Sequence, residues 1–261
     1  NSRMAEEDDY YLRFDGENDR DGSGSWSECA KPGIPKTLTN MPLVIQRTAL
    51  ANQGTSSEVA TFTIKQFTYA DRLIGDELTN PLPSFVNKRI NKVLFFRNRL
   101  VFLSGENVIT SRPGSLGEPD FFSESALTIS SSDPIDISAA STFPSELFDG
   151  IAINTGLVVF STNQQFLLAS DDTVLNPDTA KLRSISTFNY NKDIAPISLG
   201  TTIGYVDNSG KFSRFNEMAN VRREGEPAVV EVSKVVPTLL PKDVDLLTNS
   251  RENGIILFAK N

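Results

Sequence analysis

A strand–turn–strand pattern of about fifty residues recurs four times between residues 93 and 261 of this 261-residue chain. In each copy a short apolar strand is followed by a turn rich in Asn and Gly, and then by a continuously apolar strand. The continuously apolar strands begin at residues 100, 157, 203 and 255, at successive offsets of 57, 46 and 52. Continuous apolar runs indicate strands that are buried on both faces. The chain is therefore predicted to be mainly β, with a repeated architecture.

Short strands joined by Asn and Gly turns at this period indicate β-propeller blades of three or four antiparallel strands. The fourth copy stops before its hairpin is complete, so we expect an incomplete β-propeller and a chain that is one piece of a longer protein. A sandwich or barrel with irregular hairpins is the alternative, because offsets that vary by about ten residues are loose for a repeat. The gaps between repeats contain candidate outer strands at 127–129, 135–137, 182–188 and 229–236.

Three regions are expected along the chain. Residues 1–70 form a small β-rich module, part of a larger discontinuous domain, and residues 71–92 form a connector in which two prolines enforce extended backbone. Residues 93–261 are the propeller blades, with the last blade truncated. Helical periodicity is weak, with at most one turn near 145–148. The strands predicted in the module are a hairpin of 10–14 with 26–29 around the polar loop 15–25, and strands at 43–46 and 61–67.

The net charge of −8 is concentrated at the beginning of the chain, where residues 1–28 contain nine acids and three bases. The other residues contain 24 acids and 22 bases. Nucleic-acid binding depends on clustered Lys and Arg that neutralise phosphates, so we expect no static DNA groove. The densest basic stretch is interpreted as a solvated face or an inter-subunit contact, and it comprises Lys88, Arg89, Lys92, Arg97 and Arg99.

The number of cysteines and the length of the apolar runs argue against cysteine-based sites and against membrane insertion. Cys29 is the only cysteine, which excludes an intrachain disulfide and a cysteine metal cluster. The longest apolar runs have four or five residues, far below the roughly 20 needed to cross a bilayer, so we expect no membrane insertion.

The chain contains no histidine, which excludes Ser-His-Asp and Cys-His catalysis and histidine-ligated zinc. Hydrolysis by two carboxylates remains conceivable, because propellers can carry glycosidases. The close acid pairs are near predicted turns, where Asp is favoured for local hydrogen bonding. We therefore predict no catalytic residues, no enzyme activity and no cofactor. These acid pairs are Asp133 with Asp136, Asp171 with Asp172, and Asp243 with Asp245.

One acidic loop has the ligand spacing of a calcium site, with Glu17, Asp19, Asp21 and Glu28 as candidate ligands and Gly22 at the sharp turn. Two observations oppose calcium binding. The first ligand is Glu where Asp is usual, and the flanking segments are predicted to be strands, not helices. We expect an acidic hairpin tip without a metal.

The connector and the first repeat contain a long, varied motif. It resembles the tail tubular protein B, or tail nozzle, family of short-tailed bacteriophages, and the good match spans roughly residues 10 to 140. Tyr69 and Val101 depart from the family pattern, which has Trp and often Gly at these positions. The matching residues include Ala70-Asp71-Arg72-Leu73-Ile74-Gly75-Asp76, Thr79-Asn80-Pro81-x-Pro83-Ser84-Phe85, Phe95-Phe96-Arg97-Asn98-Arg99-Leu100 and Ser132-Asp133-Pro134-Ile135-Asp136.

The resemblance implies a structural virion protein that is assembled in the host cytoplasm. It implies a homohexameric ring in the phage tail that encloses the DNA-ejection channel, with the tail adaptor protein and tail fibres as partners. DNA would pass through without specific binding, which fits a nearly neutral to acidic chain. The motif residues expected at the connector or an interface are Asp71, Arg72, Gly75, Asp76, Asn80, Pro81, Pro83, Phe85, Arg97, Asn98 and Arg99.

Local roles are also expected within the motif. Asp71, Arg72 and Asp76 form either an ion-pair network that braces the connector or an ordinary surface cluster. The core is expected to contain Phe85, Phe95, Phe96 and Phe102.

Two other classes of protein remain open. One is a carbohydrate-binding or carbohydrate-active β-propeller, and the other is a cellular scaffolding propeller, which a monomeric intact protein would favour. Sugar sites usually stack on exposed Trp or Tyr, and this chain has one Trp and five Tyr. Exposed Trp or Tyr side chains that line a pocket would therefore favour the carbohydrate hypothesis over the other two.

Overall fold

The computed structural model describes residues 10–18, 21–39, 41–114, 118–141, 144–170, 174–208 and 210–260. The chain divides into two compact units. Unit 1 comprises Asn1–Leu82 and Gly114–Thr128, and unit 2 comprises Pro83–Pro113 and Ile129–Asn261. The regular structure of the described residues consists of strands, apart from a short 3₁₀ helix, η2 (Val232–Val235). The prediction of a mainly β fold is confirmed.

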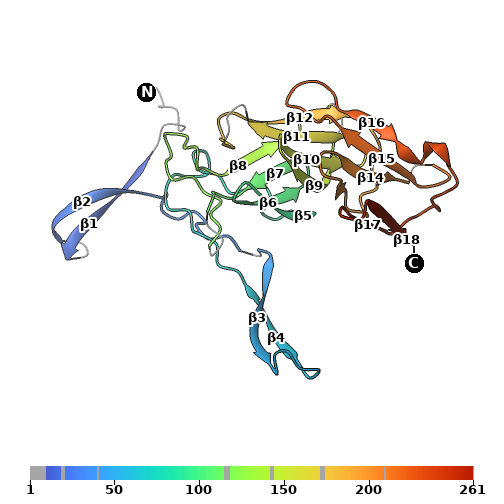
Figure 1. Cartoon of the computed structure of the whole chain (residues 1–261). Helices are drawn as coiled ribbons and strands as arrows, with labels where there is room; N and C mark the ends of the chain where they lie inside the picture. The colour runs from blue at the N-terminus through green and yellow to red at the C-terminus, as the bar shows by residue number, and fades with distance from the viewer. Residues whose placement is uncertain are drawn as a thin grey trace. The chain divides into compact units, whose positions relative to one another are not determined.

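Unit 2 contains three consecutive four-stranded sheets, in each of which every strand pairs antiparallel with the next strand along the chain (Figure 1). The first sheet is β5 (Lys92–Phe96), β6 (Arg99–Ser104), β7 (Asn107–Thr110) and β8 (Ile135–Ser138). The second sheet is β9 (Leu147–Ile153), β10 (Gly156–Ser161), β11 (Gln165–Ser170) and β12 (Ala180–Ser186). The third sheet is β13 (Ile197–Ser198), β14 (Ile203–Asp207), β15 (Arg214–Ala219) and β16 (Ala228–Glu231), and a final hairpin follows with β17 (Leu246–Ser250) and β18 (Ile255–Ala259).

The four continuously apolar segments found in the sequence occupy the same position in their sheets. Residues 100, 157, 203 and 255 lie in β6, β10, β14 and β18, which are the second strands of their sheets. All residues of β10 and β14 are buried. For these two strands, the expectation that continuous apolar runs are buried on both faces is confirmed.

Strand β10 shows how two-sided burial joins the sheets. Because side chains alternate along a strand, Leu157 and Val159 pack in the core shared with the first sheet. Val158 and Phe160 pack in the next core, together with Tyr205 of the third sheet. The second sheet therefore has a hydrophobic core on each of its faces.

The third sheet repeats this arrangement. Its Tyr205 belongs to the core shared with the second sheet, whereas Val206 and Phe215 belong to a core with Leu247 of β17. Phe215 also meets Phe258 of β18 edge-on, with ring centroids 5.3 Å apart. Consecutive sheets are thus connected by alternating side chains of their middle strands.

Several predicted outer elements differ in the structure. Residues 127–129 form no strand, and the helical turn expected near 145–148 is wrong, because β9 begins at Leu147 and buries it completely. The predicted strand 229–236 ends at Glu231 and continues as η2. Buried Ser233 of η2 accepts a hydrogen bond from the Phe215 amide, at 3.1 Å, which explains why the chain turns inward there.

The prediction that Phe95 is a core residue is wrong, whereas Phe85, Phe96 and Phe102 are buried as expected. Phe95 lies on β5, the edge strand of the first sheet, and its side chain is 52% exposed. Its neighbour Phe96 points to the opposite face, into the core shared with the second sheet. Strand alternation therefore divides the Phe95-Phe96 pair between solvent and core.

Unit 1 contains two hairpins, β1 (Tyr11–Asn18) with β2 (Asp21–Cys29) and β3 (Leu43–Ala51) with β4 (Val59–Gln66). Both are drawn as bare two-stranded ribbons in Figure 1. The polar loop expected at 15–25 is mostly strand, since the pairing continues to Asn18 with Asp21. Asp15 supports this longer ribbon, because its carboxylate accepts hydrogen bonds from Arg13 and from Ser27 on the opposite strand.

No helix in the described part of the chain is long and apolar enough to cross a membrane.

Replacement of Phe166 by Ala is expected to destabilise unit 2 by about 4 kcal/mol, because the side chain is fully buried and its removal leaves a cavity in the core between the first and second sheets. Phe95→Ala is the matched control, with an expected loss of about 0.5 kcal/mol or less. Urea unfolding followed by circular dichroism measures both. Equal losses would contradict the packing described for these two phenylalanines.

Candidate assembly site around the connector

Asp76 is the centre of a compact hydrogen-bonded turn in unit 1. Its carboxylate accepts hydrogen bonds from the backbone amides of Leu78 and Thr79, at 2.9 and 3.0 Å, and from the Thr79 hydroxyl, at 3.1 Å. The Tyr11 hydroxyl donates to the other carboxylate oxygen at 3.2 Å and so ties β1 to the turn. The Thr79 amide, followed by the other donors, holds the pKa of Asp76 below its ordinary value, although burial opposes this.

Gly75 and Asn80 connect the same turn to other segments of unit 1. Gly75 has a φ of +72°, and a Cβ there would lie 2.8 Å from the Thr79 hydroxyl oxygen, so the turn requires glycine. The buried Asn80 side chain donates to the carbonyls of Ile74 and Ser123 and accepts from the Ser123 amide. These motif residues therefore determine the local fold.

Arg72 is completely buried, and its guanidinium nitrogens have no hydrogen-bond partner. The guanidinium stacks over the Phe122 ring, with 5.3 Å from Cζ to the ring centroid. Neither alternative for Asp71, Arg72 and Asp76 describes the structure. The ion-pair network is not formed, because amides and hydroxyls occupy the Asp76 carboxylate, and a surface cluster is excluded because Arg72 and Asp76 are buried. Burial lowers the pKa of Arg72, and the Coulombic attraction of Glu77 and Asp76 opposes this only in part.

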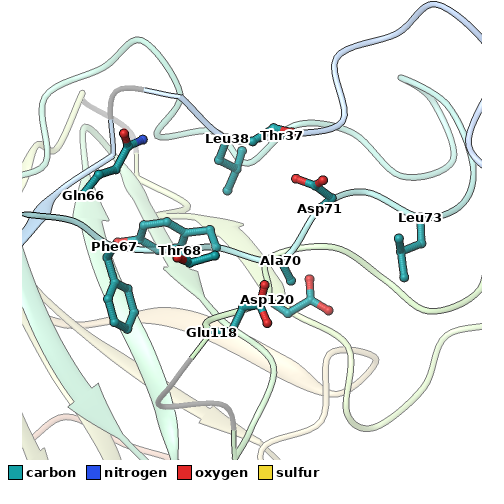
Figure 2. A pocket seen from close by; sticks show the side chains of 11 residues that line it. Thr37, Leu38, Gln66, Phe67, Thr68, Ala70, Asp71, Leu73, Glu118 and Asp120 are labelled. Carbon is teal, nitrogen blue, oxygen red and sulfur yellow. The ribbon is translucent and has the colours of Figure 1, made fainter.

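Asp71 is exposed and lines a pocket of about 670 Å³ in unit 1 (Figure 2). Glu118 and Asp120 supply two further carboxylates to this pocket, and Leu38 and Phe67 supply apolar surface. Asp120 accepts a hydrogen bond from the Phe122 amide at 2.8 Å. The described residues contain no group of three or more acidic, Cys or His side chains arranged to hold a metal ion.

The motif continues from Pro81, near the end of unit 1, into unit 2, where it begins with a buried aromatic contact. Pro81 is exposed, whereas Pro83 and Phe85 are buried, and Phe85 meets Phe102 edge-on at 5.0 Å. Between them, Ser84 donates from its amide and its hydroxyl to the carboxylate of Asp136, at 2.7 and 2.6 Å. This segment therefore covers one face of the first sheet.

Arg97 and Asn98 form the two-residue turn between β5 and β6. Both have positive φ, 46° and 61°, which is the conformation that a tight hairpin turn requires. The Arg97 guanidinium lies over the Phe96 ring, at 5.4 Å. These two motif residues therefore determine the turn of the β5–β6 hairpin, and Asn98 is exposed at the tip of the hairpin.

Arg99 is 2% exposed and donates to four backbone carbonyls. The acceptors are Ser111 at 2.9 Å, Asp133 at 2.7 Å, Ser131 at 2.9 Å and Leu175 at 3.3 Å. Leu175 precedes β12, so this side chain links the first sheet to the second. The interpretation of Arg99 as part of a solvated face is wrong.

The candidate calcium ligands lie along the first hairpin. Glu17 and Asp21 are near its tip, Asp19 lies outside the described residues, and Glu28 pairs with Leu12. At about 3.4 Å per residue, Glu28 lies roughly 24 Å along the strand from Asp21. The structure therefore does not bring Glu28 together with Asp21.

In one of the close acid pairs, Asp133 and Asp136, both carboxylates accept structural hydrogen bonds. Asp133 accepts the Ser130 amide at 2.7 Å, and Asp136 binds Ser84 as described. The Asp245 amide pairs with the Ala259 carbonyl, and Asp243 has a φ of 61°. Asp171 and Asp172 lie outside the described residues. Asp133 and Asp136 therefore have a structural role, because their carboxylates accept hydrogen bonds within the fold.

Comparison with known proteins decides the family. A family model described as "Bacteriophage nozzle protein" matches residues 1–261. The chain belongs to the bacteriophage nozzle protein family. The tail tubular protein gp12 of Escherichia phage T7 is 28% identical over 240 residues, which cover 91% of this chain and 28% of that protein. The nozzle resemblance found over residues 10–140 is confirmed, and the chain spans 28% of the length of the curated relative it matches.

Sequence reasoning missed an ionic contact between the first two sheets of this nozzle protein. Lys92 Nζ lies 2.6 Å from Asp149 Oδ2, and the Asp149 side chain is 8% exposed. The contact links β5 of the first sheet to β9 of the second. No local pattern could have revealed it, because the partners are 57 residues apart and meet only when the sheets stack.

Replacement of Asp76 by Asn is expected to lower the free energy of unfolding of unit 1 by roughly 2 kcal/mol at pH 7, because an amide cannot accept all the hydrogen bonds of the carboxylate. The contribution of a carboxylate whose pKa is depressed in the folded state is present above the unfolded pKa of about 3.9 and is lost as the pH falls below it. The difference between wild type and variant should therefore narrow below about pH 4 in urea unfolding experiments. The exposed residue Asp71 supplies the control, Asp71→Asn, and an equal loss there would contradict the assignment.

Arg72→Met and Arg99→Met should have opposite consequences. Removal of a buried guanidinium without hydrogen bonds relieves a desolvation cost, so Arg72→Met should leave the free energy of unfolding within about 1 kcal/mol of wild type or raise it. Arg99→Met should lower it by about 3 kcal/mol, because four buried carbonyls lose their donor. Denaturant unfolding of both variants provides the test. A large loss from Arg72→Met would contradict the expectation, because it would show that the contacts with Phe122, Glu77 and Asp76 outweigh the desolvation cost of the guanidinium.

Proposed function

We propose that this chain is part of a structural, non-enzymatic subunit of a bacteriophage tail nozzle. The match of the whole chain to the nozzle protein family carries this proposal. Six subunits form a closed ring that encloses the DNA-ejection channel of the virion. The ring contacts the tail adaptor protein and helps to attach the tail fibres, and it assembles in the host cytoplasm.

The architecture of unit 2 supports a further detail, that its sheets are consecutive blades of an incomplete β-propeller. Each sheet is a four-stranded antiparallel meander, and neighbouring sheets share a core. The second strands of the three sheets, β6, β10 and β14, occupy equivalent positions. The final hairpin β17–β18 begins a fourth unit of the same kind, with Leu247 directed into the preceding core. Repetition around an axis is the way propellers protect their sheet edges.

The charge distribution supports passage of DNA without specific binding. Residues 29–261 contain 24 acids and 22 bases, so the chain has no excess of phosphate-neutralising groups. Arg99 is buried and Lys92 is paired with Asp149, so two members of the densest basic stretch have internal partners. A polyanion would meet little attraction from these residues.

The polar pocket of unit 2 gives the carbohydrate alternative no support. A polar pocket of about 590 Å³ lies at one end of the second and third sheets, and its lining contains no Trp or Tyr. Tyr190 and Tyr205 are buried in the core, and the single tryptophan, Trp26, lies on the hairpin β1–β2. No aromatic stacking surface accompanies this pocket.

The full-length subunit is expected to form closed six-fold rings in electron micrographs, with a native mass of six subunits. A head-to-tail contact closes into a ring when its rotation divides a full turn. A subunit that remains monomeric at micromolar concentration, with an intact β-type circular dichroism spectrum, would refute the ring. Hydrolysis of a glycan by the purified subunit, abolished by Asp133→Ala or Asp136→Ala, would refute the structural role.

A further inference from the structure

The hairpin β3–β4 has one apolar and one polar face. Its pairing register places Ile45 opposite Ile64 and Arg47 opposite Phe62, so these side chains share one face with Leu43. The opposite face is formed by Val44, Gln46, Thr48, Thr63 and Lys65. Thr48 and Thr63 are in hydrogen-bond contact on that polar face, at 3.3 Å.

The apolar face of β3–β4 is uncovered in this chain. Leu43, Ile45, Phe62 and Ile64 are between 59% and 66% exposed. An isolated two-stranded hairpin is marginally stable in water, and clustered exposed apolar side chains mark interaction surfaces. The ribbon therefore needs a partner that covers this one face.

The hairpin β1–β2 presents a second uncovered apolar face. Phe14 pairs with Trp26, with ring centroids 5.3 Å apart, and Leu12 lies beside them on the same face. Trp26 is 66% exposed and Leu12 is 47% exposed. The other face contains Tyr11, whose hydroxyl is bound to Asp76. The free face is thus the one that contains tryptophan, the residue most enriched in the energetic centres of interfaces.

The two ribbons have opposite charge. Tyr11–Cys29 contains five acids and two bases, a net charge of −3, whereas 43–66 contains two bases and one acid, a net charge of +1. Complementary charge favours encounter between different ribbons, and like charge disfavours contact between two copies of β1–β2.

We propose that the apolar face of β3–β4 in one subunit packs on the apolar face of β1–β2 in the neighbouring copy of the same chain. This inference rests on the proposed ring and identifies one of its contacts. The contact joins two different surfaces, so it is head-to-tail, which is the type that generates rings. A ribbon of nine residues is about 30 Å long and 10 Å wide, so the contact covers roughly 300 Å² per partner. A standard interface covers about 800 Å² per partner, so other surfaces contribute to the ring.

Photo-crosslinking in the full-length subunit tests the contact. Phe62 is replaced by p-benzoylphenylalanine, which preserves an aromatic side chain on the apolar face. The assembled protein, made from a mixture of isotopically light and heavy subunits, is irradiated and digested. We expect mixed-isotope cross-links between the Phe62 position and peptides that contain residues 10–28.

The same probe at Thr63, on the polar face of the same ribbon, is the matched control. Its cross-linking yield to residues 10–28 should be at least several-fold lower. Equal yields from both positions, or cross-links from the Phe62 position to another copy of β3–β4 or to another region, would overturn the inference. Rings that form without a cross-link would also overturn it while leaving the proposed function intact, whereas monomers would refute the ring itself.

A second pair of variants gives an independent readout if the photoprobe disturbs folding. Ile64→Glu places a charge on the apolar face, and Thr63→Glu places the same charge on the polar face. Ile64→Glu should raise the subunit concentration at which rings half-dissociate by roughly tenfold, and Thr63→Glu should change it less than threefold. Equal effects would count against docking through the apolar face.

Discussion

Two-sided burial of the middle strands is the constraint on which the structure of unit 2 depends. In β10, Leu157 and Val159 enter one core while Val158 and Phe160 enter the next, so one strand stabilises two interfaces between sheets. Each sheet therefore depends on its neighbours for the burial of its apolar side chains. A repeat with this property is stable as a series and not as a single sheet, which explains why similar apolar strands recur along the chain.

Buried polar groups then determine how the first two sheets are joined. Arg99 donates to carbonyls on both sides of the boundary, and Lys92 of β5 pairs with Asp149 of β9. Apolar packing alone permits sliding between sheets, whereas charged groups that are satisfied at defined positions favour one arrangement. Arg72 of unit 1 is the contrasting case, because its guanidinium is buried over an aromatic ring without a hydrogen bond.

Unit 1 is organised by a different principle. Its connector turn is held by hydrogen bonds from backbone and side chains to Asp76 and Asn80, and its two hairpins leave apolar faces exposed. The Tyr11–Asp76 hydrogen bond ties this turn to β1, so the turn supports the ribbon β1–β2 without covering its apolar face. In a nozzle protein this division gives unit 2 internal stability and leaves unit 1 with exposed apolar surfaces, which the proposed contact with another copy would cover.

The amino-acid sequence by itself determined the mainly β class, the equivalence of the strands that begin at 100, 157, 203 and 255, and the nozzle family, because apolar periodicity and a long motif are local properties. Tertiary structure alone decided which side of a strand is covered. Phe95 and Phe96 are identical side chains, yet only Phe96 faces a neighbouring sheet. It also decided the partners of charged groups: Asp76 binds amides and hydroxyls and not Arg72, Arg99 binds four carbonyls from three segments, and Lys92 meets Asp149 across 57 residues of chain. The physical reason is that burial and electrostatic pairing depend on which distant segments come together, and composition and spacing do not encode those distances.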